Sequence, residues 1–175
     1  MMKYDESMIG TYGSYGISLV NDRVVRKEAQ FSTRESFDFI RNLVLHLIQE
    51  PNPMVVPVFR FEVLEEVNEK HNARWGVYKY AYEMRRLPML DKDEKNLITR
   101  LVGQYRPVTR DHIDPYIQRG WREYPALVEF MNQVLADGHY TDLHNGNFLK
   151  DEEGNYRIID LEGFSQYPGV GKRQS

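Results

Sequence analysis

Strand patterns are concentrated in the first half of this 175-residue sequence, and helix patterns in the second half. Residues 9–27 predict two strands joined at Asn21-Asp22, a pair that tolerates the positive φ of a tight hairpin. Residues 54–67 are rich in β-formers and predict a strand pair, and residues 74–84 alternate aromatic with other side chains and predict another strand. Strands and helices separated in this way favour an α+β fold over a doubly wound sheet.

Three segments carry the apolar spacing of amphipathic helices. They are residues 32–50, 91–105 and 124–136. Ser32 or Thr33 can cap the start of the first helix, and Pro51 ends it. After the third helix, the Glu-Gly-Asn sequence at 153–155 predicts a tight turn between two short strands, while residues 166–175 are expected to be loose.

Bulk composition narrows the classes of protein to which the chain can belong. Hydrophobic residues make up 41% and charged residues 28%, the proportions of a globular protein with a core. The net charge of −3 has no basic excess, so we expect no nucleic-acid partner. The absence of cysteine excludes disulfides and thiolate zinc sites. No run of about 18 apolar residues and no signal peptide is present, so we expect no membrane span and a cytoplasmic location.

Chemically useful side chains are densest in HYTDLHNGNF, residues 139–148, and in the YRIIDLEGF that follows. Asn147 comes five residues after Asp142, and Asp160 comes thirteen residues after Asn147. Phosphoryl transfer needs an acid to orient the attacking hydroxyl and oxygen ligands for Mg²⁺. Because a hairpin between the two segments would return Asp160 to Asn147, the sequence predicts one orienting acid and a two-residue metal site.

The segment TDLHNGNFL, followed by YRIIDLEGF, resembles the catalytic and metal-binding loops of the protein-kinase-like superfamily. His144 and Gly146 make it more similar to the aminoglycoside- and choline-phosphotransferase branch. The resemblance implies a bilobal fold within the α+β class. A β-rich N-lobe would span residues 1–84, and a reduced, mainly helical C-lobe would span residues 85–175. It also implies ATP and Mg²⁺ as cofactors.

On this resemblance, the tail of the chain would supply the catalytic groups. Asp142 would be the catalytic base, and Asn147 and Asp160 would bind the metal. His144 would organise the loop or stand near the transferred phosphate, and Glu162 would be a supplementary metal ligand. Two alternatives stay open from the residues themselves: the set could be polar turns that flank a hairpin, and Glu162 could be a solvated turn acid.

The first half of the chain offers residues for the nucleotide. Gly13 and Gly16 lie in a turn whose backbone amides could close over phosphates, although an ordinary hairpin turn is the alternative. Val25 and Lys27 would share one face of a strand. Val25 would then touch the adenine and Lys27 the phosphates, unless Lys27 is a solvated lysine at the end of the strand.

Two further parts of the nucleotide site follow from the resemblance alone. Glu35, on the first helix, would be the acid that pairs with Lys27. Glu83 and Met84 would belong to the hinge whose backbone binds the adenine, with Tyr82 at the back of the pocket.

The sequence therefore predicts a minimal kinase-like ATP-dependent phosphotransferase. The acceptor would be a protein Ser/Thr or a small-molecule hydroxyl. After Gly163 the chain has little room for the segments that hold peptide substrates in protein kinases, so a protein partner is expected to help in recognition. The alternatives are an inactive pseudokinase that binds and regulates a partner protein, and an enzyme that transfers AMP instead of phosphate.

Overall fold

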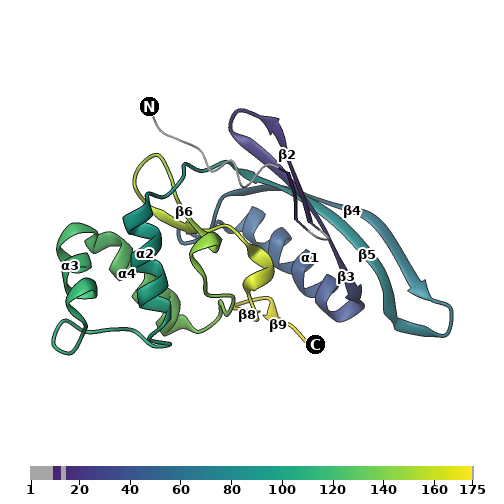
Figure 1. Cartoon of the computed structure of the whole chain (residues 1–175). Coiled ribbons are helices and arrows are strands. Elements are labelled where there is room, and N and C mark those ends of the chain that lie inside the picture. The colour runs from purple at the N-terminus through teal and green to yellow at the C-terminus, as the bar shows by residue number, and fades with distance from the viewer. Residues whose placement is uncertain (1–9, 13–14, 175) are drawn as a thin grey trace.

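The computed structural model describes residues 10–12 and 15–174 of the chain. Its largest element is an antiparallel sheet with the strand order β1-β2-β3-β5-β4. The strands are β1 (Gly10–Tyr12), β2 (Tyr15–Asn21), β3 (Val24–Thr33), β4 (Val58–Glu69) and β5 (Asn72–Arg85). Helix α1 (Arg34–Gln49) packs on the sheet, and the β4–β5 hairpin extends beyond the rest of the molecule (Figure 1).

Strand β3 alternates its side chains between the core and the outer face of the sheet. Val25, Lys27 and Ala29 are buried, whereas Arg26 and Glu28 face outward and form an ion pair with each other. The predicted shared face of Val25 and Lys27 is therefore confirmed.

Helix α1 begins where its sequence allows a cap. The Thr33 side chain accepts a hydrogen bond from the Ser36 N–H, which satisfies one amide of the first turn. The buried face of α1 includes Phe37, Ile40 and Leu47, and the Phe37 ring stacks on Tyr78 of β5 at 5.4 Å. Helix and sheet thus share one core.

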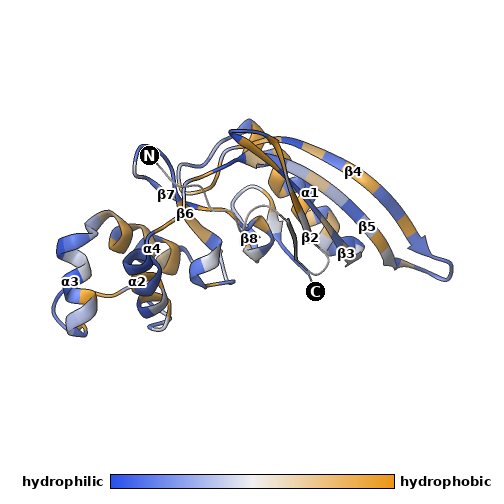
Figure 2. Ribbon diagram, turned by 45° about the horizontal axis from the view of Figure 1, so that its top comes forward, coloured by the Kyte–Doolittle hydropathy of each residue, from blue (hydrophilic) through white to orange (hydrophobic). Residues whose placement is uncertain are grey.

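Three helices form a separate group: α2 (Lys92–Val102), α3 (Pro115–Glu123) and α4 (Pro125–Asp137). Figure 2 shows long hydrophilic stretches on α2 and α3, and hydrophilic and hydrophobic residues alternating along β4. Helix α3 was not expected from the sequence. It has only nine residues but carries a start signal, because Asp114 caps it and Pro115 follows at the first helical position. Within the described residues, no helix combines the length and the apolar character needed to cross a bilayer.

The remaining elements lie between the sheet and the three helices (Figure 1). They are η2 (Asn145–Asn147), β6 (Phe148–Lys150), β7 (Tyr156–Ile158), η3 (Leu161–Gly163), β8 (Gln166–Tyr167) and β9 (Gly171–Lys172). β6 pairs with β7 around the turn expected at 153–155, where Gly154 supplies a φ of +89°. The Val56 N–H donates to the Ile158 carbonyl at 2.9 Å, which ties β7 to the chain entering β4.

The mixed α+β class is confirmed, and two local expectations are wrong. Residues 54–67 do not form a strand pair, because residues 54–56 bond to Ile158 and only the chain beyond Pro57 enters the sheet, as one strand. Residues 166–175 are not loose throughout. They contain the β8–β9 hairpin, whose reversal uses the positive φ of Gly169 and Gly171.

Candidate active site

Asp142 and Asn147 are brought together by the short η2 turn. Asn147 is 4% exposed, and its Nδ2 donates to the Asp142 Oδ2 at 3.0 Å and to the Asp142 carbonyl at 2.8 Å. The Asp142 side chain is 53% exposed, so its carboxylate is oriented by a buried amide and still reaches the surface. Since the side-chain nitrogen of Asn147 donates to Asp142, the side-chain oxygen Oδ1 is the atom of this carboxamide that can act as an acceptor or ligand.

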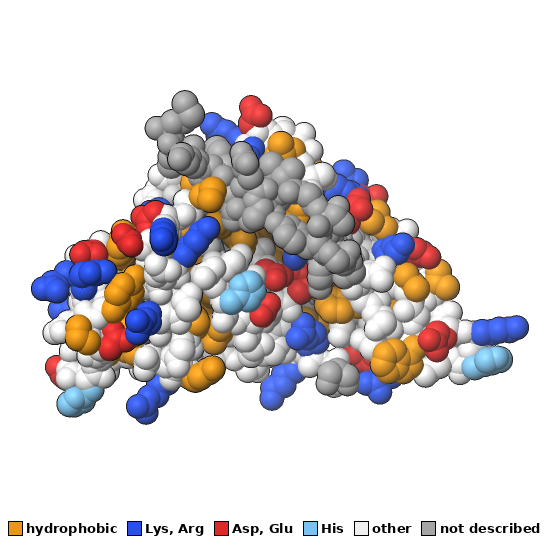
Figure 3. Space-filling view, viewed as in Figure 1, with side chains coloured by type: hydrophobic (Ala, Val, Ile, Leu, Met, Phe, Trp, Pro, Cys, Tyr) orange, Lys and Arg blue, Asp and Glu red, His pale blue; other side chains and the backbone are white. Residues whose placement is uncertain are grey.

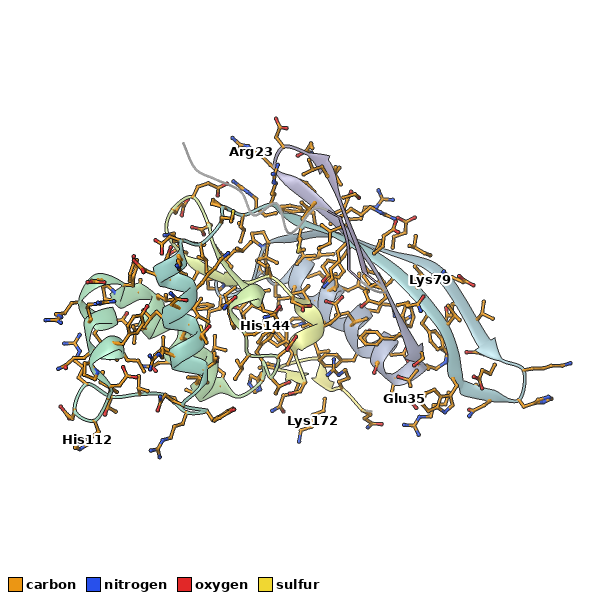
Figure 4. The ribbon with its side chains drawn as sticks, in the orientation of Figure 1. Arg23, Glu35, Lys79, His112, His144 and Lys172 are labelled. Carbon is orange, nitrogen blue, oxygen red and sulfur yellow. The ribbon has the colours of Figure 1, made fainter. Side chains whose placement is uncertain are left out.

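His144 shapes this loop. Its Nδ1 accepts a hydrogen bond from the Gly146 N–H at 3.1 Å, so the proton of the neutral ring lies on Nε2. Nε2 is 3.7 Å from the Asp142 Oδ2, and the ring is 58% exposed. Figure 4 shows His144 between the helical group and the sheet, and Figure 3 shows acidic side chains beside a histidine at the centre of the same face.

Asp160 reaches the same region through backbone bonds. The Ile159 N–H donates to the Asn147 carbonyl at 3.0 Å, and the Tyr140 hydroxyl donates to the Asp160 carbonyl at 2.7 Å. Tyr140 is 3% exposed and lies against Gly163, where a Cβ would be 2.7 Å from its Cε2. The residues predicted to act together, Asp142, Asn147 and Asp160, are therefore held in one connected region of the structure.

Lys27 enters this region from the sheet. Its Nζ lies 3.0 Å from the Asp160 Oδ1 and 2.8 Å from the Glu162 Oε2, and its side chain is only 8% exposed. Burial lowers the pKa of Lys27, but the Glu162 and Asp160 carboxylates outweigh this effect and raise the pKa above its usual value. Lys27 is thus a buried cation and not a solvated lysine at the end of a strand.

The two carboxylates beside Lys27 have different surroundings. Burial raises the pKa of Asp160 to about 6, and the neighbouring Glu162 adds to the rise while Lys27 opposes it. Burial also opposes ionisation of Glu162, but Lys27 and the hydrogen bond from the Tyr80 hydroxyl outweigh it and lower the pKa of Glu162 to about 2. Glu162 is therefore the carboxylate that stays ionised.

Glu162 was expected to bind metal or to be a solvated turn acid, and its contacts fit neither role. Its Oε1 accepts from the Tyr80 hydroxyl at 2.8 Å, and its Oε2 accepts from the Tyr82 hydroxyl at 2.9 Å as well as from Lys27. The side chain is 7% exposed. Both oxygens are thus occupied by protein donors, because the η3 turn directs Glu162 toward β5.

Glu35 does not take the position expected for it beside Lys27. Its Oε1 lies 3.2 Å from the Arg74 Nε, at the start of β5. Thr33, which caps α1, comes six residues after Lys27 along β3, and at about 3.3 Å per residue this spans roughly 20 Å. Because Glu35 is in the first turn of the helix, it lies at the far end of the sheet, well away from His144 in Figure 4.

Glu83 and Met84, which were expected to belong to a hinge, lie inside the sheet. Met84 pairs with Val25 on one side and with Val58 on the other, and Glu83 pairs with Arg26 and Arg60. Their peptide groups therefore belong to the sheet, and the connection from the sheet to the helices begins after Arg85.

The other residues predicted for the nucleotide have mixed outcomes. Val25 is fully buried beside Met84, on the same face of β3 as Lys27. Gly16 lies in β2 opposite Glu28, and a Cβ there would meet nothing within 4 Å. Gly13 lies outside the described residues.

Sequence reasoning missed a buried acid that supports the site from the side of the helices. Glu94 is 1% exposed, completes a capping box with Asp91, and contacts the Lys150 Nζ at 3.0 Å and the Tyr156 hydroxyl. The capping box could have been predicted from Asp91 and Glu94, which are three residues apart at the start of an amphipathic helix. The contacts of Glu94 with β6 and β7 could not be predicted from neighbouring residues, since they join segments more than 50 residues apart in the sequence.

A cavity of about 610 Å³ lies at a different place in the molecule. Its walls include His46, Asn52, His139, Tyr140 and Phe164, but not Lys27, Asp142 or Asp160. One of its wall residues, Tyr140, also donates to the Asp160 carbonyl of the candidate site.

The described residues contain no cluster of three or more His, Asp or Glu side chains arranged to hold a metal ion. A site built on the Asn147 carboxamide and one carboxylate is of a different composition from such a cluster. A scan of the sequence against protein-family models gave no match, and neither did a search of curated proteins.

Proposed function

We propose that this protein is an ATP-dependent phosphotransferase with a kinase-like arrangement of its site, in which Lys27 binds nucleotide phosphates between the sheet and the helical group. One observation carries the proposal. Lys27 and Asp160 are 133 residues apart in the sequence and form a direct ion pair, next to the Asp142–Asn147 hydrogen bond. A polar turn without chemistry has no physical need for a buried lysine.

The available oxygen donors suit magnesium. Mg²⁺ prefers hard oxygen ligands, commonly one or two from protein carboxylates, together with substrate phosphates. Asp160 would supply a carboxylate oxygen, and Asn147 would supply the carbonyl oxygen that remains after its nitrogen binds Asp142. Bound Mg²⁺ would neutralise the charge of the phosphates.

The residues of the chain would then position the reaction. Lys27 would hold phosphate oxygens, and Asp142 would accept a hydrogen bond from the acceptor hydroxyl. The hydroxyl oxygen forms a bond to the γ-phosphorus while the bond from that phosphorus to the bridging oxygen breaks. ADP leaves with the electron pair, and the hydroxyl proton passes to Asp142. Asp142 suits this role because its carboxylate is half-exposed and fixed from behind by Asn147.

The acceptor would be a hydroxyl of a protein Ser/Thr or of a small molecule, and a cytoplasmic location, where ATP is plentiful, belongs to the same proposal. The arrangement of Asp142 favours transfer over a role limited to binding a partner protein. A protein that only binds a partner has no need of an exposed carboxylate oriented by a buried amide.

The test is incubation of the protein and a cell extract with γ-labelled ATP, and in parallel with α-labelled ATP. Transfer of γ-label alone is the expected result, and transfer of α-label would show AMP transfer instead. Asp142→Asn should lower the transfer by about 10²–10⁴-fold, the usual contribution of a positioned acid or base. The same variant should keep the rise in melting temperature that Mg²⁺-ATP gives to the native state. Undiminished transfer by Asp142→Asn would remove Asp142 from the mechanism.

A further inference from the structure

Among the described residues, the Lys27 ammonium contacts two carboxylates, and the proposed function requires one of these to bind the metal instead. Lys27 contacts Asp160 at 3.0 Å and Glu162 at 2.8 Å. If Asp160 binds the metal, it changes partner when nucleotide arrives. An unpaired buried ammonium is costly, so an acid that stays beside Lys27 keeps it paired and in place while Asp160 gives way to the nucleotide phosphates.

Glu162 is held in place more firmly than Asp160. Its side chain is 7% exposed, against 28% for Asp160. The hydroxyls of Tyr80 and Tyr82, both buried, hold its two oxygens from β5. Moving Glu162 would break these hydrogen bonds from two buried hydroxyls, whereas Asp160 can turn toward the surface at lower cost.

The backbone of Glu162 is fixed as well. The Arg173 Nη1 donates to the Glu162 carbonyl at 2.6 Å, and the Arg173 N–H donates to the Ser165 carbonyl at 2.8 Å. Arg173, near the C-terminus, therefore holds the backbone of the η3 turn, while Tyr80 and Tyr82 hold the Glu162 side chain. Glu162 is held by groups from two separate parts of the sequence.

We infer that Glu162 is the positioning residue for Lys27. Fixed by Tyr80 and Tyr82, it holds the ammonium while Asp160 is released to bind metal. It thereby does what the resemblance assigned to Glu35, which instead pairs with Arg74 at the far end of the sheet. The inference rests on the proposed function, because it concerns the lysine of the same site.

The test compares the two acids by isosteric substitution. Glu162→Gln and Glu35→Gln each remove one negative charge, and the affinity for ATP in the presence of Mg²⁺ is measured by calorimetry. Glu162→Gln should weaken binding by about tenfold to hundredfold, the usual effect of losing a charged hydrogen bond. The affinity of Glu35→Gln for ATP should stay within about threefold of wild type, since the partly exposed ion pair of Glu35 with Arg74 lies at the far end of the sheet and such pairs contribute little. Equal losses, or a loss only in Glu35→Gln, would overturn the inference.

A second measurement does not depend on nucleotide. A double-mutant cycle of thermal unfolding combines Lys27→Met with Glu162→Gln, and separately with Asp160→Asn. The shifts in melting temperature should be more strongly non-additive for the Glu162 pair than for the Asp160 pair. If wild type bound no ATP, the proposed function would fail while this cycle still decided which acid holds Lys27. Additive shifts for Lys27 and Glu162 would overturn the inference even if wild type bound ATP.

One further variant separates positioning from a purely structural role. Tyr80→Phe removes one donor to Glu162 and keeps the ring in the core, so it serves if Glu162→Gln does not fold. It should raise the KM for ATP severalfold more than it lowers kcat, because it disturbs the placement of Lys27 and not the acceptor. A lower melting temperature with unchanged KM would assign Tyr80 and Glu162 to stability alone.

Discussion

Gly163→Ala should destabilise the protein by pushing the Tyr140 ring out of place. A Cβ at residue 163 would lie 2.7 Å from the Tyr140 Cε2, whereas carbon atoms in contact prefer about 3.5–4.0 Å. The ring cannot retreat freely, because it packs against Phe164 at 4.9 Å and Phe148 at 5.7 Å. Any shift also strains the bond from the Tyr140 hydroxyl to the Asp160 carbonyl, 2.7 Å long.

The expected loss of stability combines the overpacking around the new methyl group with the disturbed Tyr140 hydrogen bond. Overpacking of a core costs about 1–3 kcal/mol, and loss of the Tyr140 hydrogen bond adds about 0.5–1.5 kcal/mol because the Asp160 carbonyl keeps the Gly163 N–H as a donor, so we expect roughly 3 kcal/mol in all. In a protein of this length the melting temperature should fall by roughly 6–12 °C, measured by circular dichroism. The control is Gly16→Ala, where the added methyl meets nothing within 4 Å and should cost less than about 0.5 kcal/mol.

Tyr140→Leu removes the atoms that the new methyl would meet, and this gives the decisive comparison. In the Tyr140→Leu background, Gly163→Ala should cost at least about 1 kcal/mol less than it does alone, the size of coupling expected for residues in contact. A Gly163→Ala variant as stable as wild type, or costs that simply add, would refute the packing argument.

The remaining predictions concern the supports of the site. Glu94→Ala should lower the free energy of unfolding by about 3 kcal/mol in urea titrations, because it leaves Lys150 and Tyr156 without their buried carboxylate; a loss below about 1 kcal/mol would contradict this. At Asp151, burial raises the pKa, but the N–H of Asn155 and the Arg157 side chain outweigh it and hold the pKa below its usual value. The resulting stabilisation is present above the unfolded-state pKa of about 4 and is lost as the pH falls through the lowered pKa. The difference in urea midpoint between wild type and Asp151→Asn should therefore shrink from about pH 6 to about pH 3, and a constant difference would contradict it.

Periodic and turn-forming parts of the fold could be predicted from the sequence. Helix α1 follows from the spacing of Phe37, Ile40 and Leu47, which the structure buries. The β6–β7 hairpin follows from the Gly154 turn, and the shared face of Val25 and Lys27 follows from the two-residue period of a strand. Each of these signals is local, so the neighbouring residues alone determine it.

The partners of charged side chains could not be predicted in the same way. Glu162 meets Lys27 because a three-residue turn directs it toward the sheet, across 135 residues of sequence. The alternation of Tyr80 and Tyr82 marked a buried face of β5 but not the acid that their hydroxyls bind. Glu35 was misplaced for the opposite reason: its position along the sheet is set by the length of β3, which runs six residues past Lys27.

The central claim is that Lys27, Asp160 and Asn147 form one site for Mg²⁺ and ATP. Calorimetric titration of ATP into the wild-type protein and into Asp160→Asn, each with and without Mg²⁺, tests it most directly. We expect ATP to bind wild type more tightly with Mg²⁺ than without, and this dependence on Mg²⁺ to be lost in Asp160→Asn. No binding to wild type at millimolar ATP, or the same Mg²⁺ dependence in both proteins, would contradict the account.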